Sequence, residues 1–493
     1  MLNDFCEIIS REQAEEFYEN VEFVRGNTKP DPEVFSLYII APDATVIKLW
    51  CALSVHRTNN DMILCEFELE DDVKFPIVSS VDAPCAPADT LGSNPTAEDI
   101  AASTEVVSRP LRVLRRSNQT RGETALNVYR ITSQIQEQFG AAVSIDHLLK
   151  VVVGVVKEVT RFHRVLIYQF DSSWNGKVVA ELVDKTKTTD LYMGLYFPAY
   201  DIPEQARNLY RINKVRLLYD RDMPTARLVC KSAEDLETPL DMTYCYLRAM
   251  SPIHLKYLEN MGVRASMSIS ITINGNLWGL ISCHSYGNHG MRVTFPLRTM
   301  CMIIGESASR NVERLTDTSK LQARKLINTV PTGQVPSGYI IASSDDLVKL
   351  FHADFGILSI NNETKLLGKM IATQEALALL EYLRIKRFKS VTTCQHIAED
   401  FPDLKYPPGF QVLGGFLLVP LSGEGNDFIV FLRKWQLKQI HWAGNPFDKE
   451  VAGSLMPRKS FNLWVENVKG KCSEWTEDQG DIYISCYSRY LVC

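Results

Sequence analysis

One helical pattern, from Leu297 to about Val330, constrains the fold of this chain most, because no stop signal interrupts it before Pro331. Strand-like runs and shorter helical patterns lie on both sides of it. A helix of this length therefore predicts a connector between two folded parts. The length of the chain agrees, because 493 residues are too many for a single hydrophobic core.

An α+β domain is expected on each side of this helix. Before it, residues 121–310 combine helical patterns with the hairpin SMSISITINGNLWGLISCH, in which Asn274-Gly275 is a strong two-residue turn signal. After it, residues 311–479 hold the strand-like runs YIIAS, FGILSI and GGFLLVPL. The predicted fold class is α+β and multidomain, with antiparallel sheets that are flanked by helices.

The segment 428–476 predicts a long hairpin that protrudes from the second domain. Two strand-like runs flank a middle that Pro and Gly interrupt. The segment also holds four of the seven tryptophans of the chain, which are Trp435, Trp442, Trp464 and Trp475. Residues 480–493 continue no pattern and form an atypical tail.

The first 120 residues are harder to assign. Residues 1–75 combine one helical segment with three strand-like runs, which make a partial sheet with an exposed edge. We therefore expect the chain to begin part-way through a domain. Residues 76–120 are rich in Pro, Ser, Ala and Asp and lack periodicity, which predicts a disordered linker.

Composition excludes several classes of protein. A net charge of −6 offers no basic surface, so no nucleic-acid partner is expected. The 12 cysteines are scattered without zinc-site spacing, which is typical of free thiols in a reducing compartment. Neither a signal peptide nor a bilayer-spanning run is visible, so we expect no membrane partner and a cytoplasmic or nuclear protein.

The stretch YFPAYDIPEQARNLY places Asp201 between an aromatic-proline pair and a second proline. The simplest interpretation is helix capping. Asp201 is then the N-cap, Pro203 lies in the first turn, and Glu204 stands in capping-box register.

Two further stretches carry polar residues in a spacing that suits a binding site. SPIHLKYLENMG predicts a short helix that begins at Pro252 and stops at Gly262, with His254 and Tyr257 on one face. In the hairpin, Ser266, Ser268 and Ser270 alternate with aliphatic residues, and His284 ends the second strand. Strict pairing around a two-residue turn puts Ser266 and His284 on opposite faces, so a common pocket requires a β-bulge.

Arg216 and Arg248 flank these stretches, and either can hold a carboxylate. The combined set of Asp, Arg, His, Ser and Tyr side chains suits a large, flat, apolar ligand with acidic arms and N–H donors. It suits a catalytic dyad poorly. Cys283 and His284 are adjacent on a strand and point to opposite faces, so they cannot act as nucleophile and base.

These motifs, in this order, resemble the phytochromes. FPAYDIPEQARNLY is similar to the family's PASDIP segment, with Tyr200 in place of the usual Ser. LRAMSPIHLKYLENMGVRASMS and LWGLISCH are similar to its other chromophore-pocket motifs, and WAGNP, PRKSF and LWVENVKGKCSEW to its tongue. The resemblance implies a partial PAS domain (1–75), a GAF domain (121–310) and a PHY domain (311–479) whose tongue is 428–476. Acidic CEFELEDD and the insert after it resemble the fungal branch, which with the bacterial one binds biliverdin.

The resemblance implies a linear tetrapyrrole, biliverdin, as the cofactor. Its propionates would meet Arg216, Arg248 and the serines, while the main-chain carbonyl of Asp201 and His254 would lie near its nitrogens. The carboxylate of Asp201 would bond Arg458 or Ser460 of the tongue. The implied chromophore-binding positions are Tyr168, Asp201, Ile202, Pro203, Arg216, Arg248, His254, Tyr257, Ser266, Ser268 and His284, and the implied tongue contacts are Trp442, Arg458 and Ser460.

The resemblance stops at covalent attachment and at the output module. Plant and cyanobacterial members attach bilin through a Cys directly before the motif's His, where this chain has Ile253. Bacterial and fungal members use a Cys upstream of the PAS core, and Cys6 is a poor substitute for it. Non-covalent binding is therefore expected. No H-box or Gly-rich ATP lid follows the tongue, so no kinase activity is expected.

The expected function is red/far-red light reception, with signalling through the tongue to partners that the sequence does not specify. Two alternatives stay open: a light-insensitive GAF sensor of another small ligand, and a truncated, non-functional fragment. The connecting helix is either a homodimer interface or a plain connector.

Overall fold

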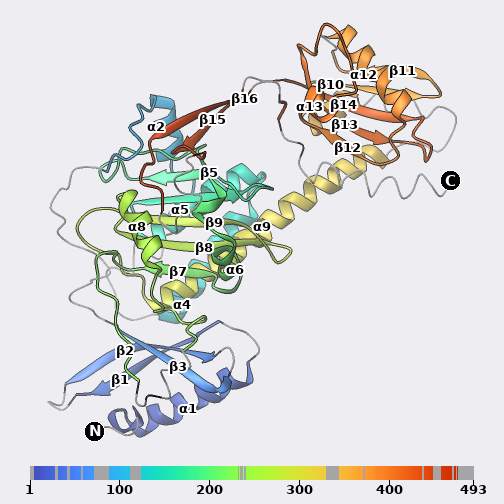
Figure 1. The fold of residues 1–493 in the computed structure, drawn as a ribbon. Coiled ribbons are helices and arrows are strands. Elements are labelled where there is room, and N and C mark those ends of the chain that lie inside the picture. The colour runs from blue at the N-terminus through green and yellow to red at the C-terminus, as the bar shows by residue number, and fades with distance from the viewer. Residues whose placement is uncertain are drawn as a thin grey trace. The chain divides into compact units, whose positions relative to one another are not determined.

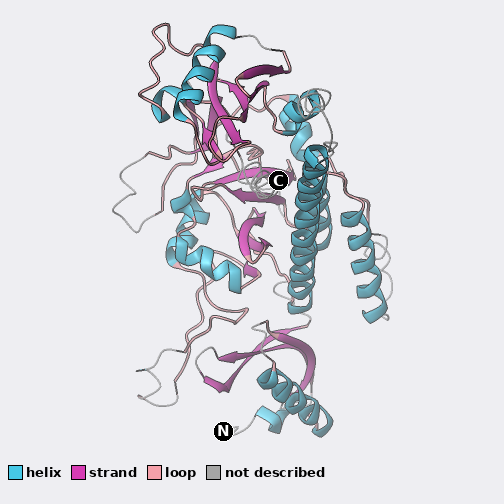
Figure 2. Ribbon diagram, turned by 90° about the vertical axis from the view of Figure 1, so that its right-hand side faces the viewer, coloured by secondary structure: helices cyan, strands magenta, loops and turns pink. Residues whose placement is uncertain are grey.

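The computed structural model describes residues 5–27, 31–41, 45–56, 59–70, 88–111, 124–230, 233, 237, 240–328, 344–369, 372–435, 438–447, 457–468, 471–473 and 475. The chain divides into two compact units. Unit 1 comprises Met1–Glu313 and His441–Trp464, and unit 2 comprises Arg314–Ile440 and Val465–Cys493. Both mix antiparallel strands with flanking helices, which confirms the predicted α+β, multidomain class (Figure 1, Figure 2).

Unit 1 begins with one helix on a three-stranded antiparallel sheet, as the sequence predicts. The elements are η1 (Phe5–Ile8), α1 (Arg11–Gly26), β1 (Glu33–Ile40), β2 (Val46–His56) and β3 (Asn59–Leu69), and the sheet order is β1-β2-β3. Ser10 caps α1 by accepting the Gln13 amide. The buried side of α1, through Phe17 and Val21, shares one hydrophobic cluster with Leu37 and Leu53 of the sheet.

The prediction of a disordered linker over 76–120 is wrong for residues 88–111. They include helix α2 (Ala97–Thr104), which a capping box between Thr96 and Asp99 starts. Further along, the Leu111 amide donates to the Glu158 carboxylate at 3.0 Å. The order therefore comes from long-range hydrogen bonds, which local periodicity does not register. Residues 76–87 and 112–120 lie outside the described residues.

An eight-stranded sheet, in the order β16-β15-β6-β5-β4-β9-β8-β7, forms the centre of unit 1. Helix α5 packs on β4 and β5, and its apolar run VVVGVV is buried. The elements are α4 (Thr124–Gly140), α5 (Ile145–Thr160), β4 (Arg164–Phe170), β5 (Gly176–Val183), β6 (Tyr196–Phe197), η2 (Ala199–Asp201), α6 (Glu204–Ile212), β7 (Val215–Leu218), α8 (Pro252–Asn260), β8 (Ala265–Ile273) and β9 (Asn276–Ser285).

The hairpin of β8 and β9 contains both features that its sequence predicts. Asn274 and Gly275 have φ values of 48° and 76°, as a tight two-residue turn requires. The pairing shifts register between Ile271 and Thr272, and beyond this bulge Ser266 stands opposite His284. The bulge therefore turns both side chains to one face of the sheet.

The tongue (residues 428–476) contributes strands to both units. β14 (Phe428–Lys434) belongs to the sheet of unit 2. β15 (Lys438–Ala443) and β16 (Leu463–Val468) extend the sheet of unit 1, where Trp442 of β15 pairs in parallel with Tyr196 of β6. A parallel pair between such distant segments has no signal in the sequence.

Helix α9 (Phe295–Asn328) matches the predicted long helix and contributes residues to both units. Unit 2 has an antiparallel sheet in the order β11-β10-β14-β13-β12, with α11 on one face and α12 on the other. Its elements before β14 are α11 (Ser344–Leu350), β10 (Phe355–Ile360), β11 (Glu363–Leu367), α12 (Thr373–Lys386), β12 (Thr392–Cys394), α13 (Ile397–Asp400) and β13 (Leu413–Pro420). The run YIIAS and the tail 480–493 lie outside the described residues. No helix in the described ranges combines the length and apolarity that a bilayer crossing needs.

Candidate functional site

Asp201 does not cap a helix, which corrects the capping interpretation. It ends η2, and the N-cap of α6 is Pro203, which makes no side-chain cap bond. Near the start of α6, Arg207 Nη1 donates a hydrogen bond of 2.6 Å to the main-chain carbonyl of Ile202. The carboxylate of Asp201 is used elsewhere, because two long-range partners hold it.

Those partners are Arg458 of the tongue and Tyr257 of α8. Arg458 Nε and Nη2 donate to the two carboxylate oxygens of Asp201 at 3.0 and 2.6 Å. Tyr257 Oη donates to Oδ2 at 3.1 Å. The side chains of Arg458 and Asp201 are only 5% and 3% exposed, so the pair is both bidentate and buried.

The surroundings of this pair shift both pKa values. Burial raises the pKa of Asp201, and the charge of Arg458 opposes that rise. Burial works against the charged guanidinium too, but Asp201 and Tyr257 outweigh it and raise the pKa of Arg458. Each group therefore depends on the other, and removal of either leaves a buried charge without its partner.

Gly444, in the WAGNP motif, makes room for Arg458. Its φ is +90°, and a Cβ there would collide with Arg458 Nη1 and lie 2.6 Å from the carbonyl oxygen of Ser460. Nη1 uses this space to donate to the carbonyl of Ala443. The motif thus provides both the acceptor and the close approach.

The other tongue residues separate into buried and exposed ones. Trp442 is buried, and its ring centroid lies 5.5 Å from that of Tyr196. Phe461, the last residue of the PRKSF motif, is buried between the Tyr257 ring, at 5.2 Å, and the Arg458 guanidinium, at 4.3 Å. Ser460 is exposed, and its Oγ accepts the Asn462 amide at 3.2 Å.

Helix α8 begins and ends as predicted and presents three polar side chains to the site. Pro252 is its first residue and Gly262, at φ +68°, follows its end, but Ser251 makes no side-chain cap bond. The rings of His254 and Tyr257 are stacked at 6.0 Å. One turn on, Asn260 Nδ2 donates to the main-chain carbonyl of Arg458 at 2.9 Å.

Both histidines of the site are neutral at neutral pH. Burial, followed by the positive charge of Arg216, lowers the pKa of His254 to about 4. Burial, then Arg164 and His254, lowers the pKa of His284 to about 3. His284 Nδ1 has no hydrogen-bond partner among the described residues, so it is available to a ligand.

The serines opposite and beside His284 differ in availability. Ser266 is buried directly across from it, and Ser268 is half-buried. Ser270 is buried, and its Oγ donates to the carbonyl of Tyr210 at 2.7 Å. Ser266 and Ser268 are therefore the hydroxyls that remain for a ligand.

Arg216 and Arg248 form a pair of neighbouring cations. Arg216 Nη2 donates to the carbonyls of Arg248 and Ala249, the latter at 2.9 Å. Burial and then the charge of Arg248 lower the pKa of Arg216 to about 10. Arg216 Nη1 and Arg248 Nε are buried and lack partners within the described part of the chain. Two adjacent guanidinium groups with unused donors suit carboxylates.

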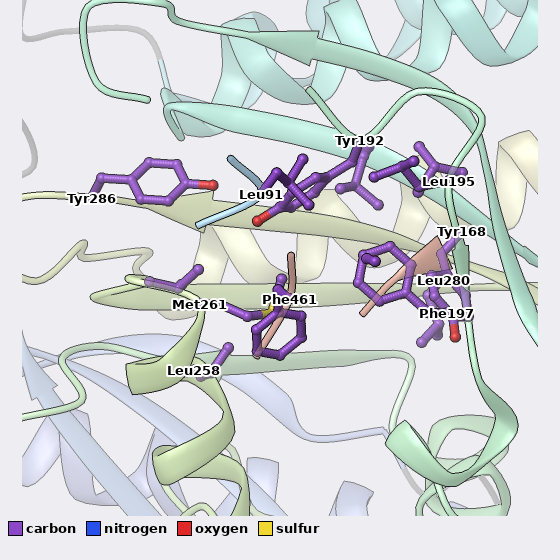
Figure 3. Close-up of a cluster of buried hydrophobic side chains, with 14 of the residues drawn as sticks. Leu91, Tyr168, Tyr192, Leu195, Phe197, Leu258, Met261, Leu280, Tyr286 and Phe461 are labelled. Carbon is purple, nitrogen blue, oxygen red and sulfur yellow. The ribbon is translucent and has the colours of Figure 1, made fainter. Parts of the chain in front are cut away.

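A buried apolar cluster lines the site (Figure 3). Tyr168 of β4 belongs to it, with its ring 5.8 Å from that of Phe197, and Ile202 packs against it. Sequence reasoning missed most of its members, because they stand outside the recognised motifs or carried no polar signal. The buried members that it did not name are Leu91, Leu166, Val178, Tyr192, Leu195, Phe197, Leu258, Val263, Leu277, Leu280, Tyr286 and Ala443.

Metal and nucleophile chemistry find little support in this arrangement. In the ranges that the structure describes, no group of three or more His, Cys, Asp or Glu side chains is placed to hold a metal ion. Cys283 is buried, and burial raises the pKa of its thiol well above its usual range.

Comparison with known proteins gives two family matches. A model described as "GAF domain" matches residues 144–310, and one described as "Phytochrome region" matches residues 319–484. The bacteriophytochrome of Xanthomonas campestris pv. campestris (strain 8004) is 32% identical over 354 residues, 68% of this chain and 54% of that protein. Cyanobacterial phytochrome B of Nostoc sp. (strain PCC 7120) is 31% identical over 65% of this chain and 44% of that protein. The chain thus spans about half the length of these relatives.

Two solved structures share the fold. The wild-type photosensory core module of the Stigmatella aurantiaca phytochrome is 27% identical with a TM-score of 0.67, and the alignment covers 99% of this chain and 88% of that one. A bacteriophytochrome from R. palustris is 22% identical with a TM-score of 0.68, with the same coverage of 99% and 88%, which speaks for the fold alone.

Proposed function

The chain belongs to the phytochrome family, and on this premise we propose that it is a red/far-red photoreceptor that binds biliverdin in unit 1 and signals through the tongue. The domain limits of 1–75 (partial PAS), 121–310 (GAF) and 311–479 (PHY) are part of this proposal. The proposal also includes a sensory rather than a catalytic role, a location in the cytoplasm or nucleus, and a homodimer that forms through α9.

One observation carries the proposal: Arg216 and Arg248 are neighbouring cations with unused donors, beside two neutral histidines. A linear tetrapyrrole has two propionates for the arginines, and its flat apolar body suits the aromatic cluster. The donor Nη1 of Arg216 and the imidazole nitrogen of His284 are the buried polar atoms that such a ligand would satisfy.

Each residue has a separate task toward the ligand. Ser266 and Ser268 would add hydroxyl donors near the arginines, while Tyr168 and Tyr257 would pack on its apolar body. The Asp201 carbonyl and His254 would accept hydrogen bonds from the pyrrole N–H groups. Pro203 fixes the chain that carries Asp201. When bound, the tetrapyrrole supplies the absorption of red light.

We propose that binding is non-covalent. Ile253 stands next to His254 and is 41% exposed, where attachment through α8 would need a thiol. None of the cysteines that the structure describes belongs to the buried cluster. A denaturing gel with zinc fluorescence tests this: an unlabelled band after biliverdin loading is expected, and a fluorescent band would contradict it.

A visible spectrum after mixing the protein with biliverdin tests the proposed function. We expect a red band that red and far-red light bleach and restore. Replacing Arg216 and Arg248 together by Ala should abolish the band, whereas Arg310→Ala on the exposed surface of α9 should leave it unchanged. Binding without photobleaching would favour a light-insensitive sensor, and absence of binding would favour a non-functional fragment.

A further inference from the structure

Residues 88–92, here called the docking segment, lie outside both family matches and carry no motif. Asp190, in the connection between β5 and β6, holds them. Its carboxylate accepts the amide of Thr90 at 2.9 Å, the Thr90 hydroxyl at 2.8 Å and the amide of Leu91 at 3.0 Å. Asp190 is only 1% exposed, so these bonds are formed away from water.

The start of the docking segment is fixed by a second set of bonds. Ala88 forms a parallel bridge with Thr188, and its carbonyl accepts the Thr188 hydroxyl at 2.9 Å and the Thr189 amide at 2.9 Å. Gly262, at the end of α8, lies beneath it, because a Cβ on Gly262 would be 3.5 Å from that of Ala88. The docking segment is therefore part of the framework of unit 1.

The other side of the docking segment meets the tongue. The Leu463 amide of β16 donates to the carbonyl of Leu91 at 3.1 Å. The Leu91 side chain is 2% exposed and belongs to the same buried cluster as Ala443 and Phe461 of the tongue (Figure 3). The main chain of Leu91 thus bonds the strand that follows Arg458, and its side chain shares a buried cluster with residues of the tongue.

We propose that residues 88–92 form a docking surface for the tongue and that Asp190 is the residue that positions it. The bond from Leu463 and the packing of Leu91 favour the arrangement in which Arg458 reaches Asp201. Because coupling between two contacts is reciprocal, loosening the docking segment weakens the tongue contact, and releasing the tongue loosens the docking segment. The inference concerns the protein without chromophore and does not depend on bilin binding.

The proposed coupling between the docking segment and the tongue can be tested by hydrogen exchange, measured by mass spectrometry on the full chain without chromophore. Asp190→Ala removes the acceptor of two amides and one hydroxyl. We expect exchange to become roughly tenfold faster over 88–92, as for loss of a charged hydrogen-bond partner, and at least about threefold faster over 458–464. Arg458→Ala, which releases the tongue, should in turn accelerate exchange of the Leu91 amide.

Asp184→Ala is the matched control. Asp184 lies in the same connection and also accepts an amide and a hydroxyl, both from Thr186. The Asp184→Ala variant should leave hydrogen exchange over residues 88–92 and 458–464 unchanged. Exchange over β8 and β9 reports whether the sheet itself remains folded.

If Asp190→Ala also accelerates exchange over β8 and β9, Thr90→Val is the deciding variant for the proposal, because it removes the hydroxyl bond to Asp190 but keeps both amide bonds and the shape of the side chain. It should accelerate both 88–92 and 458–464 by a smaller factor. Faster exchange over 88–92 with unchanged protection over 458–464, in either variant, would overturn the proposal.

Discussion

Arg458 in unit 1 and Arg433 in unit 2 are both buried arginines that hold a part of the tongue, but the described bonds of Arg458 include a side-chain carboxylate, whereas those of Arg433 go to main-chain carbonyls. Arg458 pairs with the side chain of Asp201 at 2.6 Å. Arg433 is 4% exposed and donates to the main-chain carbonyls of Phe351 at 2.7 Å, His352 at 3.1 Å and Ser473 at 3.0 Å. Its guanidinium also stacks on the Trp475 ring at 3.6 Å.

This difference separates a contact with an exchangeable side-chain acceptor from one whose described acceptors belong to the main chain. A carboxylate can find another partner when its surroundings change, and the exposed Ser460 offers a hydroxyl two residues from Arg458. Main-chain carbonyls are fixed by the fold around them. The Asp201 contact therefore has the chemistry of a switch, and the Arg433 contact that of an anchor for the end of the tongue.

The largest effect is expected from breaking the anchor. Arg433→Met removes the buried guanidinium and its bonds to three main-chain carbonyls of unit 2, which should lower the free energy of unfolding by about 4 kcal/mol. Urea unfolding measures the change. Lys434→Ala, which loses only a half-exposed ion pair with Asp354, should lower it by less than about 1 kcal/mol. Equal effects from the two variants would mean that Arg433 is no anchor.

Breaking the switch should release the tongue and leave the fold intact. Asp201→Ala strands the charge of Arg458, and we expect the tongue contact to weaken by about 3 kcal/mol, as for other broken buried pairs. Because Asp201 caps no helix, thermal unfolding of unit 1 should change little.

A double-mutant cycle with Arg458→Ala sharpens this prediction. The cycle is read out by hydrogen exchange over residues 458–464 and, once chromophore is bound, by the rate of thermal reversion. A coupling of at least about 1 kcal/mol is expected for side chains in direct contact. Strictly additive effects would show that the two side chains do not act on each other.

Acid should affect the switch region more than the anchor. His254 and His284 have pKa values lowered to about 4 and about 3 in the folded protein, against about 6.5 when unfolded. Their contribution to stability is complete above pH 6.5 and is lost as the pH falls toward those values, because the unfolded chain binds their protons first. Each of the two histidines should cost unit 1 about 2 kcal/mol between pH 7 and pH 5.

Urea unfolding at several pH values, followed through exchange in each unit, measures this loss. Replacing both histidines by Gln should flatten the pH dependence of unit 1. If the double variant keeps the full pH dependence of stability in unit 1, the loss of stability in acid comes from titratable groups other than these two histidines.

The smallest effect is expected from Gly444→Ala, which tests the space beside Arg458. It combines strain at φ +90° with a collision with the guanidinium, so the tongue contact should weaken by about 1–2 kcal/mol. Gly275→Ala, at φ +76° with no neighbour within 4 Å, carries the strain alone. If hydrogen exchange near the two sites rises equally, the close approach to Arg458 has no energetic role.

The sequence predicted elements that depend on local chemistry. The turn at Asn274-Gly275 and helix α8 with Pro252 and Gly262 at its ends are confirmed, and the bulge that a common pocket for Ser266 and His284 requires is present. Arg458 and Asp201 were paired through resemblance to a family, and the structure brings them together. Their roles toward a chromophore, and the fungal branch suggested by CEFELEDD, stay predictions.

What the sequence missed depends on contacts between distant residues. Asp190 and Leu91 are 99 positions apart, so the order of residues 88–92 has no local signature. The capping interpretation of Asp201 failed for a related reason. Local rules offered its carboxylate a nearby amide, but an arginine 257 positions away bound it.

The meeting of β6 with β15 at one residue pair, Tyr196 with Trp442, has an evolutionary consequence. A long ladder would fix the strength of tongue attachment through main-chain bonds that substitution cannot adjust. With one described pair between β6 and β15, attachment in unit 1 depends on the main-chain bond from Leu463 to Leu91 and on side-chain contacts such as the Arg458–Asp201 pair, which are open to mutation. Substitutions at these side chains can therefore change the strength of tongue attachment one at a time, while both sheets stay as they are.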